Sequence, residues 1–217
     1  MSLSQLNVAR ATPPAPDRRR WTLAIGVWAV GVLAGWSWFA IERGTPGETR
    51  ATPATWPAQS AIVRDTARPT LVLFAHPRCP CTRATLEEFA KLASQAGRSA
   101  RLDVAFFAPS NADSSWTETD QYRTAAAIPG VAVWQDVDGA EATWFGAATS
   151  GQVVLYDRNG SLLFSGGLTP GRGHVGDNDG RAALVACLAG DAPMVRSTPV
   201  FGCSILVPPD QPPVRSR

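Results

Sequence analysis

The stretch Leu71-Val-Leu-Phe-Ala-His-Pro-Arg-Cys79-Pro-Cys81-Thr82 decides the fold of this 217-residue chain. Its first five residues are apolar and are followed by His76-Pro77, a pattern typical of a buried parallel strand. Apolar residues then recur at helical spacing from Arg83 to Gln95, so we expect a helix that starts just after Cys81, with Thr82 as its N-cap. Two cysteines therefore lie at a strand-to-helix turn.

The position of these cysteines favours thiol chemistry. At a helix N-terminus, the unpaired N–H groups and the positive end of the helix dipole favour a thiolate over a thiol. Arg78 and Arg83 add positive charge beside the cysteines. Because a thiolate is the attacking species in disulfide exchange, Cys79 and Cys81 are the candidate catalytic residues. The alternative is that they form an inert local bridge or are ordinary buried thiols.

The rest of the chain alternates between predicted strands and helices and then forms a hairpin. Apolar runs predict strands, and Ser115-Trp-Thr-Glu118 has the form of a capping box that opens a helix closed by Pro129-Gly130. Arg158-Asn-Gly160 between two apolar runs indicates a hairpin. We expect strands at 71–75, 101–107, 131–134, 152–157 and 161–164, and a last helix at 181–189 that Asn178 or Asp179 caps. This order predicts an α/β fold with a mixed sheet flanked by helices.

On the residues Phe74-Ala-His-Pro-Arg-Cys79-Pro80-Cys81, the chain resembles the active-site segment of thioredoxin-fold oxidoreductases. Only one residue separates the cysteines, whereas the family has two, so the resemblance is closer to the RedB-like branch of membrane-anchored thioredoxin-like proteins. It extends over roughly residues 60 to 206 and implies a thioredoxin-like sheet. It also implies that Cys79 is the more exposed thiol, which forms a mixed disulfide, and that Cys81 resolves it.

The resemblance also implies supporting roles for His76, Pro77, Arg78 and Pro80. His76 precedes Cys79 by three residues and is placed to orient or protonate a thiol, or else it is a polar residue in a turn. Family members carry a cis-proline before the first strand of the hairpin, facing the thiols. Gly151 occupies the matching position here, which departs from the family pattern.

The two remaining cysteines are Cys187, on the predicted last helix, and Cys203, in the C-terminal tail. In an oxidising compartment an even number of cysteines suggests bridges, and four cysteines allow three connectivities. We prefer a 79–81 bridge with a 187–203 bridge, because the second would staple the tail to the domain. The alternative is an electron relay from Cys203 to the active pair.

An uncharged span of 21 residues, Trp21 to Ile41, is long enough to cross a bilayer as a helix of about 30 Å. Tryptophans lie toward its ends, as in an aromatic belt, and four arginines precede it whereas two follow closely. We therefore expect an uncleaved single-pass anchor with the N-terminus in the cytoplasm and the globular domain outside, in the periplasm if the source is bacterial. The competing interpretations are a cleaved signal peptide and the core helix of a soluble protein.

These features divide the chain into five parts. We expect a cytoplasmic segment at 1–20, the anchor at 21–41, a Pro/Thr/Ala-rich tether at 42–60, a thioredoxin-like domain at 61–206 and a Pro-rich tail at 207–217. The net charge is only +2, and the arginines are spread along the chain. Neither a nucleic-acid tract nor a strongly anionic partner is indicated.

The leading functional hypothesis is an extracytoplasmic thiol–disulfide oxidoreductase that acts through the Cys-Pro-Cys segment without a cofactor, on protein thiols or disulfides or with a redox partner protein. A membrane-anchored Cu(I)-binding or delivery protein of the Sco type is the rival, because soft sulfur ligands select Cu(I). By resemblance, such a protein would use Cys79, Cys81 and a histidine, either His174 or His76. A third possibility is a thioredoxin-fold adaptor whose bridge is purely structural.

Overall fold

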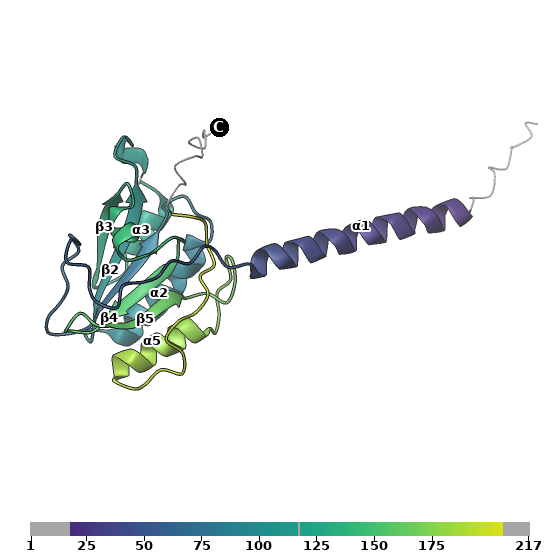
Figure 1. Ribbon diagram of the computed structural model, residues 1–217. Coiled ribbons are helices and arrows are strands. Elements are labelled where there is room, and N and C mark those ends of the chain that lie inside the picture. The colour runs from purple at the N-terminus through teal and green to yellow at the C-terminus, as the bar shows by residue number, and fades with distance from the viewer. Residues whose placement is uncertain (1–17, 117, 206–217) are drawn as a thin grey trace, which may run out of the picture. The chain divides into compact units, whose positions relative to one another are not determined.

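The structure, a computed structural model, describes residues 18–116 and 118–205. A five-stranded mixed sheet with the order β3-β2-β1-β4-β5 organises the globular part (Figure 1). Its strands are β1 Thr70–Ala75, β2 Arg101–Ala108, β3 Val131–Val137, β4 Gln152–Tyr156 and β5 Leu162–Gly167. β1 pairs in parallel with β2 and antiparallel with β4. This is the predicted βαβ unit followed by a hairpin, and the fold is thioredoxin-like.

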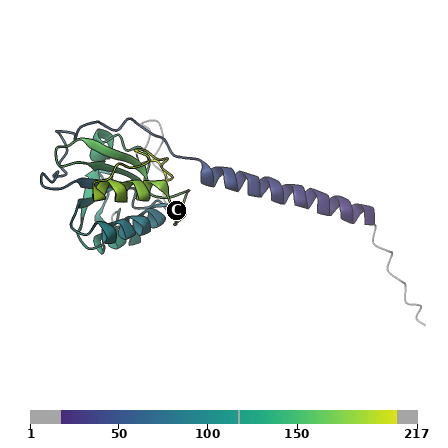
Figure 2. The ribbon, with the colours of Figure 1, turned by 90° about the horizontal axis from the view of Figure 1, so that it is seen from below.

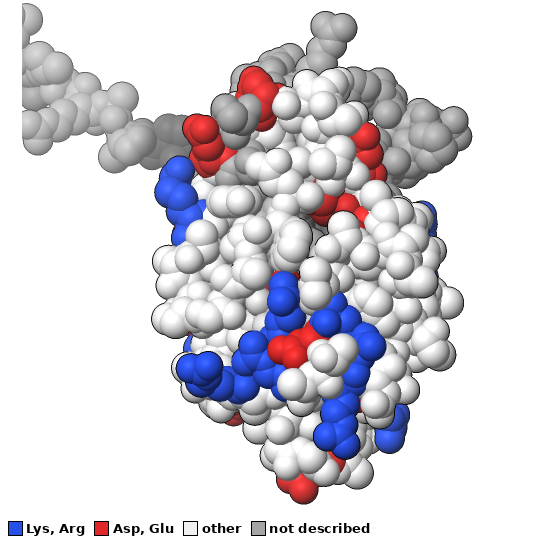
Figure 3. Space-filling model, turned by 90° about the vertical axis from the view of Figure 1, so that its left-hand side faces the viewer, with Lys and Arg blue, Asp and Glu red and all other residues white. Residues whose placement is uncertain are grey.

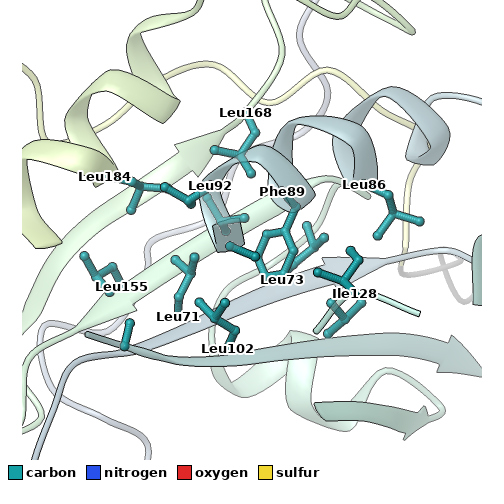
Figure 4. Packing of buried hydrophobic residues seen from close by; sticks show 14 of the residues in the cluster. Leu71, Leu73, Leu86, Phe89, Leu92, Leu102, Ile128, Leu155, Leu168 and Leu184 are labelled. Carbon is teal, nitrogen blue, oxygen red and sulfur yellow. The ribbon is translucent and has the colours of Figure 1, made fainter. Parts of the chain in front are cut away.

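β1 lies in the middle of the sheet, and all six of its residues are buried. Leu71 and Leu73 point to one face, where they pack with Phe89 of α2 and Leu184 of α5 (Figure 4). Val72 and Phe74 point to the other face. Because successive strand residues face opposite sides, a strand that is apolar throughout needs cover on both.

The helices divide between these two faces. Helices α2 (Thr82–Ala96), α3 (Asp120–Ala126) and α5 (Asp179–Ala189) lie over the Leu71 face, and α2 and α5 run side by side (Figure 2). The short helix α4 (Ala140–Trp144) lies on the Phe74 face. The apolar spacing that predicted α2 is therefore the set of positions that faces the sheet.

Two predicted helix caps are wrong, and one is confirmed. Thr82 is the first residue of α2 rather than its N-cap, which is Cys81. Helix α3 begins at Asp120, where the Thr119 side chain accepts a hydrogen bond from the Tyr122 N–H, whereas Ser115 lies in a 3-10 turn. Capping depends on which side chain reaches a free N–H, and more than one residue here has the right chemistry. The last helix begins at Asp179, two residues before the predicted start, and Asn178, one of the two predicted caps, is its N-cap.

The segment predicted to be a tether is extended, but it lies against the domain. Backbone hydrogen bonds join Trp56 to Gly160 and Leu162 to Ala54. The Trp56 ring packs edge-on against Phe145 and Tyr156, with centroids 4.9 and 5.3 Å apart. Its low apolar content suggested a free linker, but one large aromatic side chain and a few backbone bonds are enough to attach it.

Helix α1 (Arg18–Gly44) is a separate element of 27 residues. It is long and apolar enough to cross a membrane, and none of its described side chains is buried within the protein. Only residues 18–20 of the predicted cytoplasmic segment 1–20 are among the described residues, and the predicted tail 207–217 lies outside them.

Charged side chains are partly concentrated on the surface. Figure 3 shows lysine and arginine side chains gathered toward one end of one face, with acidic groups among them. Several arginines are paired locally: Arg101 contacts the buried Asp103 at 2.9 Å, and Arg68 contacts Asp65 at 2.7 Å. In these pairs an arginine is balanced by a neighbouring carboxylate, in keeping with a net charge of only +2.

Replacing Trp56 with alanine tests whether the extended segment is attached. We expect the free energy of unfolding of the domain to fall by about 2 kcal/mol, because the half-buried indole loses apolar burial and two aromatic contacts. Chemical denaturation of the full chain in detergent, followed by circular dichroism, would measure it. Trp36→Ala, in α1, is the matched control and should leave the transition unchanged. Equal transitions for both variants would mean that the segment does not stabilise the domain.

Candidate redox site

The site lies where β1 ends and α2 begins. After Ala75, the chain turns so that the Cys79 N–H donates to the His76 carbonyl at 3.1 Å, and the Thr82 N–H donates to the Cys79 carbonyl at 3.1 Å. Cys81 occupies the N-cap position, and its carbonyl accepts from the Thr85 N–H at 3.3 Å. Both cysteines of the Cys-Pro-Cys segment are therefore fixed at the carboxyl end of the central strand.

A third cysteine lies at the same place. The Sγ atom of Cys203 is 2.8 Å from the Sγ atom of Cys79, inside van der Waals contact, although the residues are 124 positions apart. All four cysteines are free thiols in this structure. Only 2% of Cys79 is exposed, whereas Cys81 and Cys203 are half-buried. The expectation that Cys79 is the more exposed thiol is wrong, because Cys79 is enclosed in the turn and in contact with the tail.

Ser150 holds the tail in register beside the turn. Its N–H donates to the Cys203 carbonyl at 2.8 Å, and its hydroxyl accepts from the His76 N–H at 2.9 Å. The Ile205 N–H donates to the Ala148 carbonyl at 2.9 Å, which continues an antiparallel pairing of the tail with the loop before β4. A single buried serine thus connects the two segments that carry the touching sulfurs.

The residue before Cys203 is fixed by close packing and by an arginine. A Cβ atom on Gly202 would lie 1.9 Å from the Ser150 carbonyl oxygen, so no larger residue fits without moving the tail. The Gly202 carbonyl accepts from Arg172 Nη1 at 2.7 Å. Arg172 belongs to the glycine-rich loop Gly171-Arg-Gly-His-Val-Gly176. This loop is anchored at Gly176, whose N–H donates to the buried Glu88 carboxylate at 3.0 Å.

The contact with Cys203 changes the acidity of Cys79. A hydrogen bond from the Cys203 thiol is the largest influence, and the pKa of Cys79 falls from its ordinary value of 9.0 to about 5. Burial opposes this effect and raises the pKa, while hydrogen bonds from the backbone of Cys203 and Cys81 and from the Thr82 hydroxyl lower it further. Arg78 and Arg83 are not among the main causes, although their positions in the sequence suggested it. These hydrogen bonds therefore favour the thiolate form of Cys79.

The other two thiols at the site stay protonated. Burial raises the pKa of Cys81, and the negative charge of Cys79 adds to it, while Arg172 opposes both. The pKa of Cys203 rises because its proton is held in the hydrogen bond to Cys79, and burial adds to this effect. One thiolate is thus stabilised at the expense of its two neighbours.

The residues beside the cysteines pack against aromatic rings. His76 stacks on Phe107 with centroids 5.6 Å apart, and the Arg78 guanidinium lies 4.1 Å from the centre of the Trp116 ring. Nδ1 of His76 accepts from the Arg78 N–H at 3.1 Å, and burial lowers the pKa of the ring. Pro77 and Pro80 complete the turn. In the described residues, no hydrogen bond joins the His76 ring to a thiol, so its contacts point to a role in shaping the turn.

Gly151 lies beside the site, as its place in the sequence indicated. Its N–H donates to the carbonyl of Phe74 in β1 at 2.8 Å, and its φ of +101° is a conformation that favours glycine. A Cβ atom there would lie 3.1 Å from the Thr85 hydroxyl. Glycine therefore allows the backbone before β4 to approach the active turn (residues 76–81, which carry Cys79 and Cys81) closely.

The preferred pairing of Cys187 with Cys203 does not match the structure. Cys203 touches Cys79, while Cys187 packs on α5 against the core. The sequence placed both residues near the C-terminus, but the tail runs away from α5 and along β5, where the Ser165 N–H donates to the Arg196 carbonyl. The contact at Cys203 is the one that the relay alternative requires.

His174 is not gathered with the thiols. It lies on the exposed glycine-rich loop, and its Nδ1 atom is 3.0 Å from the Arg172 carbonyl oxygen. Within residues 18–116 and 118–205, no group of three or more His, Cys, Asp or Glu side chains is arranged to hold a metal ion. In the described residues, neither His174 nor His76 forms a three-ligand group with the thiols.

Sequence reasoning missed Ser150 and Arg172, and it gave the approach of Cys203 to the active pair only as the relay alternative. A tail of the form Phe201-Gly-Cys203 was the only signal available, because a glycine before a cysteine permits close approach to another backbone.

Solved structures of other proteins share the fold of this chain. No family model matches the chain, and no curated protein matches it. A hypothetical protein from Sinorhizobium meliloti 1021 is similar in structure, with a TM-score of 0.58 and 25% identity over 73% of this chain and 97% of the other. An uncharacterized conserved protein from Geobacillus kaustophilus has a TM-score of 0.55 and 19% identity over 77% of this chain and 95% of its own.

A more distant match is a secreted disulfide oxidoreductase from Mycobacterium tuberculosis, described as homologous to DsbE of E. coli. Its TM-score is 0.40 and its identity 16%, over 58% of this chain and 83% of its own. The chemistry of the present chain is therefore argued from its own residues.

Titration of the thiolate tests the electrostatics of the site. We expect the thiolate absorbance of the reduced full chain to show a midpoint near pH 5 that is lost in Cys79→Ser. Cys203→Ala should move the midpoint upward, toward the ordinary value, because the main donor is gone; Cys187→Ala is the matched control and should not move it. Since the pKa of Cys79 is lower in the folded state, its contribution to stability should decline as the pH falls from about 9 to about 5. A midpoint that stays put in Cys203→Ala would contradict this account.

Proposed function

We propose that this chain is a membrane-anchored thiol–disulfide oxidoreductase of the RedB-like kind, which acts outside the cytoplasm through its Cys-Pro-Cys segment. Cys79 supplies the stabilised thiolate, and Cys81 is the second thiol of the segment. The observation that carries the proposal is the contact of 2.8 Å between the sulfur of Cys79 and a second thiol, which lowers the pKa of Cys79 to about 5. Burial without such partners would raise the pKa of a cysteine and leave it inert.

The stabilised thiolate matters in both directions of exchange. A thiolate attacks a disulfide, and a thiol of low pKa is also the better leaving group when its own disulfide is attacked. Stabilising the thiolate stabilises the reduced form, which makes the corresponding disulfide a stronger oxidant. The chemistry needs no cofactor, and protein thiols or disulfides, or a redox partner protein, are suitable reactants.

The helix α1 supports the proposed location. Its uncharged span suits a bilayer, and the three arginines at 18–20 favour a cytoplasmic N-terminus. The domain would then lie on the opposite side of the membrane, where disulfides persist.

Replacing Cys79 with serine tests the function. We expect exchange with a fluorescent glutathione disulfide, in the presence of dithiothreitol, to fall to the uncatalysed rate, because a serine hydroxyl is not ionised at neutral pH. The assay uses the full chain in detergent. Cys187→Ser is the matched control and should retain the wild-type rate. Full activity in Cys79→Ser would exclude thiol exchange at this site.

Protease added to intact spheroplasts tests the orientation. We expect the globular domain to be digested while a fragment that contains α1 stays in the membrane, because the domain lies outside. Lysed spheroplasts provide the control for protease activity. Complete protection of the domain in intact spheroplasts would place it in the cytoplasm.

A further inference from the structure

The site contains three thiols, and the sulfur–sulfur contact in the structure joins Cys79 to Cys203 rather than to Cys81. The contact of 2.8 Å joins Cys79 to Cys203, and a shift of less than about 1 Å would bring the sulfurs to the disulfide bond length of about 2.05 Å. Cys81, by contrast, is held at the start of α2 by the hydrogen bond from the Thr85 N–H to its carbonyl. A bridge between Cys79 and Cys81 would have to close across a single residue.

The tail that carries Cys203 is built into the domain. Backbone hydrogen bonds join it to three other segments. The Ser165 N–H of β5 donates to the Arg196 carbonyl, and the Gly47 N–H donates to the Val200 carbonyl. In the loop before β4, the Ser150 N–H donates to the Cys203 carbonyl. The Thr198 hydroxyl accepts from the Gly167 N–H at 3.0 Å. Because these bonds attach the tail at several points, the position of Cys203 is set by the fold and is not an incidental approach of a loose end.

Accessibility differs between the two sulfurs of this pair. Cys79 is buried to 2% exposure, and Cys203 is half-buried. A molecule that approaches from solvent therefore meets the Cys203 side of the pair. Which sulfur is attacked in disulfide exchange depends on access and on the leaving group.

We propose that Cys203 is a further catalytic residue, which forms the redox disulfide with Cys79 and receives the attack of the incoming thiolate. This proposal rests on the proposed function and names the partner of Cys79 within it. Cys81 is then a third thiol beside the pair and is not the resolving residue.

The exchange balances in two steps. A substrate thiolate attacks Sγ of Cys203; a bond forms between the two, the Cys79–Cys203 bond breaks, and the electron pair leaves with Cys79 as a thiolate. The second thiolate of a dithiol substrate then attacks the first substrate sulfur. That step forms the substrate disulfide and releases Cys203 as a thiolate, which takes up a proton and donates it in a hydrogen bond to Cys79. Two electrons pass from the substrate to the protein, and a disulfide-bearing partner restores the bridge by the reverse steps.

Peptide mapping of the oxidised wild-type chain tests the bridge without any substitution. Trypsin should place Cys79 and Cys81 in peptide 79–83, Cys187 in peptide 182–196 and Cys203 in peptide 197–215. After oxidation of the full chain in detergent by glutathione disulfide, we expect peptide 79–83 to be linked to peptide 197–215, and the link to persist in Cys81→Ser. An internal bridge within peptide 79–83, with Cys203 free, would overturn the proposal.

Trapping identifies the sulfur that meets the substrate. With glutathione disulfide, Cys79→Ser should accumulate glutathione on peptide 197–215, because no thiolate remains to displace it. Exchange should fall in Cys203→Ser to the level of Cys79→Ser, while Cys187→Ser should retain the wild-type rate. Normal exchange in Cys203→Ser combined with loss in Cys79→Ser would reject Cys203 and leave the proposed function standing. Normal exchange in Cys79→Ser would reject both.

Discussion

The burial of β1 on both faces is the constraint on which the rest of this structure depends. A strand whose six residues are all buried must be paired on both edges and covered on both sides, since any unpaired backbone group would be left without water. β2 and β4 satisfy its edges, and two separate apolar clusters cover its faces. The carboxyl end of such a strand is where the chain must emerge, and the cysteines of the active turn lie there.

Three segments that are remote in sequence meet at this end of β1. The active turn, the loop before β4 and the C-terminal tail are joined through Ser150, which bonds to His76 on one side and to Cys203 on the other. The arrangement explains why a thiol can be both buried and ionised. Hydrogen-bond donors from more than one segment converge on Cys79, and together they outweigh the cost of removing its charge from water.

The sequence predicted those parts of the protein whose cause is local. The strand at 71–75, the helix after Cys81 and the hairpin at Asn159-Gly160 follow from apolar spacing and turn chemistry, and the structure confirms them. The attachment of the segment around Trp56 and the position of Cys203 have no local cause. Each depends on a contact across about 100 residues or more, such as the hydrogen bond from the Trp56 N–H to the Gly160 carbonyl. Spacing along a chain carries no information about such pairings, and chain proximity wrongly favoured Cys187 as the partner of Cys203.

The separation of Cys79 and Cys203 in sequence links redox state to folding. A bridge between residues 124 positions apart would raise the free energy of the unfolded state by about 5 kcal/mol, because the cross-linked chain has less conformational entropy. A bridge across one residue would raise it by only about 1.6 kcal/mol in the same chain-entropy model. Folding and disulfide formation are linked in one thermodynamic cycle. The free energy by which the bridge stabilises the folded state therefore equals the free energy by which folding favours formation of the bridge. A fold that holds its tail firmly in place therefore makes this disulfide easier to form, and loosening the tail would make the protein a stronger oxidant and a less stable one at the same time.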